Sequence, residues 1–137
     1  MEKKKPLVLY DSGRGWGITS ANYAAVAEAL IRDYMKDYKG GQRELSTSKL
    51  RDIYSYIMNV RVRVNSEEEF QENLSDIQYL RVKMAYDAGR EGSVKTFLEK
   101  TFLMEIAAKI QSFDEFALYC RYAESLVAYF KFCGGKD

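Results

Sequence analysis

The sequence predicts an all-α fold: a compact bundle of about five helices, preceded by an N-terminal arm that is extended or poorly ordered. Three observations support this class. From Glu28 onward the chain is dense in strong helix formers, its only proline is Pro6, and apolar residues recur at the three- and four-residue spacing of a helical face. A chain of 137 residues can bury one sizeable core. We therefore expect an arm over residues 1–20 and a single helical-bundle domain over residues 21–137.

Capping residues and glycines bound the first two helices. The first is predicted from Asn22, a favourable N-cap residue, to Tyr38, and the glycines at positions 40 and 41 stop it. The second is predicted to start at Thr47 or Ser48 and to carry one apolar face. That face comprises Leu50, Ile53, Tyr54, Ile57 and Val60. Residues 60–64 alternate apolar and polar side chains, so the end of this helix is either helical or extended.

The next two helices differ in how much of their surface is apolar. The third begins with a capping box, in which Ser66 is the N-cap and Glu69 lies three residues later. Its apolar residues recur at helical spacing until the glycines at positions 89 and 92 end it, and a break near Asn73 is an alternative. The fourth, from Ser93 to about Gln111, is apolar almost all round, which is typical of a helix enclosed by its neighbours.

A second capping box, Ser112 with Glu115, starts the fifth helix. Its apolar residues recur at spacings of four and three; they are Phe116, Cys120, Ala123, Val127 and Phe130. Gly134 and Gly135 end it, since glycine readily takes the left-handed conformation that satisfies the last carbonyls of a helix. Because the connections between helices are short, we expect antiparallel neighbours in a compact bundle.

The arm contains one segment that resembles a nucleotide-binding loop. Leu7–Tyr10 could form a strand, and the glycines at positions 13, 15 and 17 could hold a phosphate before the first helix. The lysine and hydroxyl of a phosphate-binding loop are missing, the glycine spacing fits no dinucleotide motif, and no second strand is predicted. We therefore favour disorder here; the alternative is a mobile Gly-Arg-aromatic segment that touches RNA or a neighbouring subunit.

The composition excludes several kinds of chemistry. The sequence has no histidine, which removes Ser-His-Asp triads, Cys-His pairs and histidine-ligated metal sites. Cys120 and Cys133 lie too far apart along one predicted helix to form a disulfide, so we expect a buried thiol at Cys120 and a free thiol at Cys133. We predict no catalytic residue, no metal and no cofactor.

The charge balance and the hydropathy bound the partners. The 21 Lys and Arg residues nearly balance the 20 Asp and Glu residues, so a polyanion would have to be bound by a local patch. No secretory signal follows Met1, because Pro6 and Asp11 interrupt the apolar run, and no later run reaches membrane-spanning length. We expect a cytoplasmic protein with no membrane contact.

Two carboxylates, Glu105 and Glu124, lie among apolar residues in the sequence. General acid–base catalysis needs paired groups at a substrate site, and no nucleophile or metal ligand accompanies them. We expect each to pair with a nearby Arg or Lys, because an unpaired buried carboxylate is costly.

The third predicted helix carries the clearest binding pattern. Its Tyr79, Lys83, Tyr86 and Arg90 recur at spacings of four, three and four, so they share one face beside the apolar stripe. Further basic residues lie on an adjacent flank and at the start of the second helix; they are Arg81, Lys49 and Arg51. Cations contact phosphates and aromatic rings stack on bases, so the mixture suits RNA better than small-molecule chemistry. A solvated charged face with half-buried tyrosines is the alternative.

Three segments carry a family resemblance. Residues 45–51 read LSTSKLR, residues 80–90 read LRVKMAYDAGR, and residues 122–136 read YAESLVAYFKFCGGK. The first resembles a threonine–serine entry to the second helix, the second a central Lys-x-Ala-Tyr-x-x-Gly-Arg segment, and the third a Glu-Ala-x-Val-Ala-Tyr-x-Lys-x-x-Gly-Gly ending. All three are features of the small helical subunit of type III-A CRISPR effector complexes, the Csm-type small subunit. The chain departs from that pattern at Ser125, where alanine is usual, and at Phe130, where histidine is common.

The resemblance implies a non-catalytic subunit of a crRNA-guided complex. Several copies would stack head to tail along the crRNA and target RNA and link the large polymerase-like subunit to the backbone subunits. The implied RNA-binding positions are Lys49, Arg51, Arg81, Lys83, Arg90 and Lys131, with Lys136 as a further candidate. They would neutralise phosphates without reading bases, because pairing between the RNAs supplies the sequence specificity. Residues before Asn22 have no counterpart in the resemblance, so it implies no role for the arm.

Two other functions fit the sequence. One is a helical scaffold or adaptor that binds only proteins, through its tyrosine-rich faces. The other is an enzyme that binds a nucleotide with the glycine-rich arm. Binding that collapses at high salt distinguishes RNA from apolar protein docking, and removal of residues 1–20 tests the role of the arm.

Overall fold

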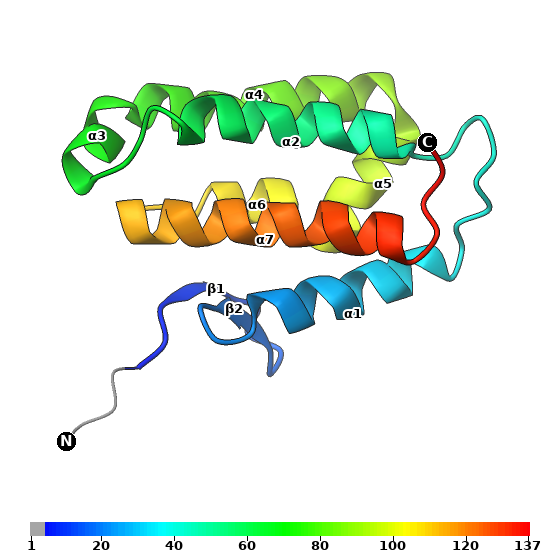
Figure 1. Cartoon of the computed structure of the whole chain (residues 1–137), viewed down its shortest axis with the longest axis horizontal. Helices are drawn as coiled ribbons and strands as arrows, with labels where there is room; N and C mark the ends of the chain where they lie inside the picture. Colours follow the sequence, from blue (N-terminus) through cyan, green and yellow to red (C-terminus); the bar gives the residue numbers. More distant parts are fainter. Residues whose placement is uncertain (1–4) are drawn as a thin grey trace.

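The computed structural model describes residues 5–137 and confirms the all-α class, with seven helices and one two-stranded hairpin in that range (Figure 1). The elements are β1 (Val8–Asp11), β2 (Gly17–Thr19), α1 (Tyr23–Met35), α2 (Thr47–Arg61), α3 (Glu67–Glu72), α4 (Leu74–Arg90), α5 (Gly92–Thr101), α6 (Leu103–Ala107) and α7 (Phe113–Phe132). Within residues 5–137, no helix has both the length and the apolar character that crossing a bilayer would demand.

The longest helix, α7, lies at the centre of the bundle. It packs against α1 on one side and α2 on the other, while α4 lies beside α2 and also contacts α5 and α6 (Figure 1). The largest fully buried side chains include Tyr119, Tyr122, Phe70, Phe97, Phe116 and Phe130. Four of these six rings lie on α7 and the other two on α3 and α5, so the aromatic part of the core is centred on α7.

Serine side chains cap three of the helices. Ser66 and Ser112 each accept a hydrogen bond from the backbone N–H three residues later, at 3.1 and 3.2 Å, as the predicted capping boxes require. The glutamate of each box accepts the N–H of the residue before the cap, Asn65 or Gln111, at 3.0 and 2.8 Å, instead of the N–H of the serine itself. Ser46 does the same for α2, at 3.1 Å. The helix therefore begins at Thr47, one of its two predicted starts.

Seven helices form where five were predicted, because two predicted helices are broken. Asn73 separates α3 from α4, which confirms the break considered there, and its side-chain amide donates to the Glu69 carbonyl at 2.8 Å. The second break was not predicted. Phe102 takes a left-handed conformation, with φ of 60°, and separates α5 from α6. The prediction of one continuous helix over residues 93–111 is therefore wrong.

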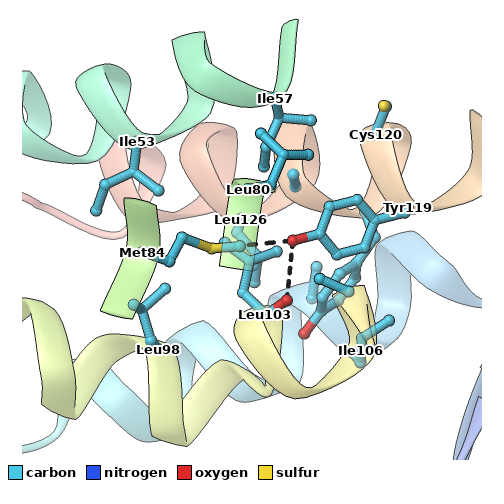
Figure 2. Packing of buried hydrophobic residues seen from close by; sticks show 14 of the residues in the cluster. Ile53, Ile57, Leu80, Met84, Leu98, Leu103, Ile106, Tyr119, Cys120 and Leu126 are labelled. Carbon is cyan, nitrogen blue, oxygen red and sulfur yellow. Dashed lines mark hydrogen bonds between the residues drawn. The ribbon is translucent and has the colours of Figure 1, made fainter. Parts of the chain in front are cut away.

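Hydrogen bonds from α7 hold the break at Phe102. The Tyr122 hydroxyl donates to the carbonyl of Thr101 at 2.5 Å. The Tyr119 hydroxyl donates to the carbonyl of Leu103 at 2.9 Å (Figure 2). The interrupted helix leaves the carbonyls of Thr101 and Leu103 in need of hydrogen-bond donors. The two tyrosine hydroxyls supply these donors, so both carbonyls are paired.

Three helix ends differ from their predicted positions or settle an alternative. Helix α1 ends at Met35, three residues before the predicted Tyr38. Helix α4 ends at Arg90, between the two glycines at positions 89 and 92 that were predicted to end it; it continues through Gly89 because an isolated glycine is tolerated inside a helix at a modest cost. At the end of α2, residues 62–63 form a turn, so the extended alternative is not adopted.

The segment for which disorder was favoured forms an antiparallel hairpin packed on the bundle. Strand β2 was not predicted; it pairs with β1, and Leu9, Tyr10 and Ile18 are buried in the core. Asn22 binds the backbone of β2 through its amide, at 2.7 and 2.9 Å, and makes no capping hydrogen bond to α1. Trp16 lies against Phe102, with ring centroids 5.3 Å apart, so the hairpin covers the helix break.

The glycine pair ends α7 as predicted. Gly134 has a φ of 106° and donates its N–H to the carbonyl of Lys131 at 3.1 Å, while Gly135 donates to the carbonyl of Phe130 at 2.8 Å. The chain then returns to the start of α2 (Figure 1). There the carbonyl of Lys136 accepts the N–H of Thr47 at 2.6 Å.

Candidate nucleic-acid interface

The sequence-predicted binding residues divide into groups on different sides of the bundle. One group follows the line along which the antiparallel helices α2 and α4 pack together. We call this line the α2/α4 seam. It consists of Lys49, Tyr56 and Arg63 from α2, with Arg63 just beyond the helix end, and of Tyr79, Lys83, Tyr86 and Arg90 from α4.

Two cations at the centre of the seam lie on tyrosine rings. The Lys83 Nζ is 5.0 Å from the ring centroid of Tyr56 and 5.6 Å from that of Tyr79. The Arg90 guanidinium is 5.2 Å from the ring centroid of Tyr86. Within residues 5–137, neither cation takes part in an ion pair. Their charges are held in place by aromatic faces and remain available to an anion.

Ion pairs close both ends of the seam. At one end the Lys49 Nζ lies 2.9 Å from Oε1 of Glu91, and this hydrogen bond raises the pKa of Lys49. At the other end Arg63 pairs with Asp76 at 2.9 Å. Lys49 was predicted to bind RNA. The structure places it in the seam, where its ammonium group is paired with the carboxylate of Glu91.

A buried carboxylate lies beneath the Lys49 end. Asp87 is 5% exposed, and its Oδ2 has no hydrogen-bond partner within the described chain. Burial, followed by the neighbouring Asp87, raises the pKa of Tyr56. Asp87 also attracts Lys49, so two acidic residues hold that lysine. Lys83 and Arg90 are therefore the seam cations whose charges are not neutralised by an ion pair within residues 5–137.

Arg81 lies apart from the other cations of α4. Arg81 precedes Lys83 by two residues, which is about 200° of rotation around the helix axis, so the two side chains project from opposite flanks of α4. Its guanidinium donates to Oε1 of Gln78 at 3.2 Å, and it borders a shallow hollow with Tyr79 and Val82. Arg81 was predicted to lie on a flank adjacent to the face of Tyr79, Lys83, Tyr86 and Arg90, and in the structure it lies outside the seam.

Arg51 and Lys131 form a second basic group near the C-terminus. The Lys131 Nζ pairs with Asp137 at 2.8 Å, and this hydrogen bond, helped by the charge of Arg51, lowers the pKa of Asp137. The further candidate, Lys136, uses its backbone to hold α2 and lays its side-chain stem against Gly40. These residues lie along α2 and α7, away from the tyrosines of α4.

Glu105 and Glu124 do not pair with Arg or Lys among residues 5–137, which corrects the prediction made for them. Both are exposed and accept hydrogen bonds from tyrosines: Glu105 from Tyr10 at 3.3 Å and Glu124 from Tyr54 at 2.9 Å. Burial, helped by Glu124, raises the pKa of Tyr54 to about 12. These carboxylates anchor tyrosine hydroxyls between elements that are distant in sequence.

Sequence reasoning missed two members of the seam, Tyr56 and Arg63. A usable signal was present, because Lys49, Tyr56 and Arg63 recur every seven residues and therefore share one face of α2. The two thiols match their prediction: Cys120 is buried, Cys133 is half-buried, and both are free. Within the described range, no three acidic or cysteine side chains converge on a common point that could hold a metal ion.

Fold and surface together define a class: a small α-helical bundle protein with a seam of cations and tyrosines on one side. The sequence profile of the family described as Csm2, type III-A, matches residues 22–136. The chain is 42% identical over 120 residues to the CRISPR system Cms protein Csm2 of Streptococcus thermophilus, covering 88% of this chain and 98% of that protein. It is 39% identical over 109 residues to the protein of the same name from Enterococcus italicus, covering 72% and 78% of the two chains. The chain therefore belongs to the Csm2 family of type III-A CRISPR systems.

Proposed function

We propose that this chain is a non-catalytic, RNA-binding subunit of a type III-A CRISPR complex. In this proposal several copies stack along the guide crRNA and the target RNA and bridge the large and backbone subunits. Membership of the Csm2 family supports a place in such a complex. The surface of the bundle supports contact with RNA.

The observation that carries the proposal is the centre of the seam. Lys83 and Arg90 lie on tyrosine rings rather than on carboxylates, so an arriving phosphate does not have to displace an internal ion pair. Phosphate contacts by Lys and Arg supply sequence-independent affinity, which is what a subunit along the guide and target RNA needs. Lys49, Arg51, Arg81 and Lys131 would add contacts from the seam end and from the flanks.

The proposal predicts a salt dependence. If four of the six cations meet phosphates, a tenfold rise in salt weakens single-strand binding roughly 600-fold, at a slope of about 0.7 per phosphate. The double variant Lys83→Gln/Arg90→Gln removes two contacts. We expect its slope to fall by about 1.4 and its affinity to fall about 15-fold at about 0.15 M salt.

A matched control separates the seam from overall charge. Lys95→Gln/Lys109→Gln also removes two exposed cations, from the α5/α6 side of the bundle, and should leave the slope within about 0.3 of the parent. Fluorescence anisotropy of labelled single-stranded RNA over a salt series gives all three slopes. Equal losses of salt slope and RNA affinity in both double variants would contradict the placement of the binding site at the seam. Affinity that is insensitive to salt would favour the protein-binding adaptor.

A further inference from the structure

The exposed tyrosines of α4 suggest what kind of RNA the seam accepts. This inference rests on the RNA-binding function proposed above. We infer that Tyr79 and Tyr86 are base-stacking residues and that α4 holds a short run of unpaired nucleotides. The bases lie against the two rings, and the phosphates lie at Lys83 and Arg90.

Exposure sets these two rings apart from the structural tyrosines. Tyr79 is 54% exposed and Tyr86 is 66% exposed, whereas Tyr119 and Tyr122 are fully buried and donate their hydroxyls to backbone carbonyls. Packing therefore does not account for the two outer rings. Exposed aromatic residues that gather on one helix face are typical of a binding surface.

A unit of one tyrosine and one cation occurs twice on this face of α4. Tyr79 is followed four residues later by Lys83, and Tyr86 is followed four residues later by Arg90; in each unit the cation lies over the ring, at 5.6 and 5.2 Å. The two units are seven residues apart, which is about 10.5 Å along the helix axis. A nucleotide strand also repeats an aromatic base and an anionic phosphate. The alternating rings and cations of α4 therefore complement the bases and phosphates of a nucleotide strand.

The same geometry favours unpaired over duplex RNA. In a duplex each base face is covered by its stacked neighbours, so a tyrosine ring can reach only base edges, sugars and phosphates. In an unpaired segment the base faces are free, and stacking on aromatic side chains tolerates any sequence. Each ring is more than half exposed beside its cation, so part of its surface is accessible to a base.

Two oligonucleotides of equal charge test the inference. One is an oligoadenylate of about ten nucleotides, and the other is the same strand with abasic sugars in place of its bases. We expect the parent chain to bind the oligoadenylate at least fivefold more tightly per stacked ring, or about 25-fold for two. Ring-proton NMR signals of Tyr79 and Tyr86 should shift upfield with the oligoadenylate only, and NMR detects this even when binding is weak.

Two variants distinguish base stacking from a general apolar contact. Tyr79→Leu/Tyr86→Leu keeps apolar, helix-favouring side chains and should reduce the base preference to within about twofold while the salt slope is unchanged. Val82→Thr is the matched control, because Val82 is 56% exposed between the two rings. It should keep the full preference.

The outcomes lead to different conclusions. A parent chain with no base preference, or a leucine variant that retains it, overturns the stacking inference while salt-dependent binding through Lys83 and Arg90 still stands. An equal loss in Val82→Thr also overturns it, because the preference would then not depend on the aromatic rings. If every seam variant keeps both the base preference and the salt slope of the parent, the proposed function is overturned as well.

Discussion

Removing the acidic partner of Lys49 should strengthen RNA binding. In the native seam this lysine is 2.9 Å from Glu91 and its side chain is 22% exposed, so the carboxylate cancels a charge that faces the same seam as Lys83. Glu91→Gln keeps the shape and removes the carboxylate bonded to the lysine, while Asp87 still attracts it. A full extra phosphate contact raises the salt slope by about 0.7 and the affinity about fourfold at about 0.15 M salt, and Asp87 makes these values the upper limit of the expected gain.

The stability of the bundle should hardly change, so the affinity can be read directly. A partly exposed ion pair contributes about 0–1 kcal/mol, and thermal unfolding of the variant will check this value. The matched control is Glu28→Gln on α1, which releases Arg32 from an ion pair of 2.8 Å on another side of the bundle. Anisotropy over a salt series should show a gain for Glu91→Gln alone. Equal gains in both variants, or a loss in Glu91→Gln, would refute the reasoning.

The remaining predictions concern the C-terminal helix. Gly135→Ala should lower the free energy of unfolding by about 1–3 kcal/mol in urea titration, because a Cβ there would overlap the fully buried ring of Phe130. Gly41→Ala, at an open position, should change it by less than about 1 kcal/mol, and equal effects would show that the ring is not confined. At neutral pH a thiol reagent should label Cys133 in the native chain and leave Cys120 unmodified until unfolding, because burial raises the pKa of Cys120 to about 12 and thiolate is the reactive form. Rapid labelling of both thiols without unfolding would contradict the enclosed position of Cys120.

The features that local sequence predicted are those that depend on neighbouring residues. Ser66 and Ser112 cap their helices because each capping bond spans three residues, and Gly134 ends α7 because its own backbone permits a positive φ. The repeat of Tyr79, Lys83, Tyr86 and Arg90 was visible for the same reason, since a helix brings residues four apart together.

The features that sequence missed depend on partners far along the chain. Phe102 breaks the predicted fourth helix because Tyr119 and Tyr122 bind carbonyls on either side of it, and these tyrosines lie on another helix. The hairpin forms because Tyr10 and Ile18 are buried against the bundle, although glycines dominate the local sequence. Propensity cannot report such tertiary contacts.

The same limit applies to the candidate site. Sequence placed Lys49 among the RNA contacts, but its pairing with Glu91 required the antiparallel approach of α2 and α4. Likewise, the Lys83 ammonium lies on Tyr56 only because the two helices meet at that level. The positions of the charged residues were visible in the sequence, whereas their partners are set by packing.

The central claim is that RNA lies along α4 and its seam with α2. The most direct test is zero-length ultraviolet crosslinking of the complex purified with its guide and target RNA, followed by mass spectrometry of the crosslinked peptides. We expect crosslinks to Tyr79, Tyr86 and the residues around Lys83. Crosslinks confined to α1, α5 and the hairpin, with α2 and α4 unmodified, would contradict the claim.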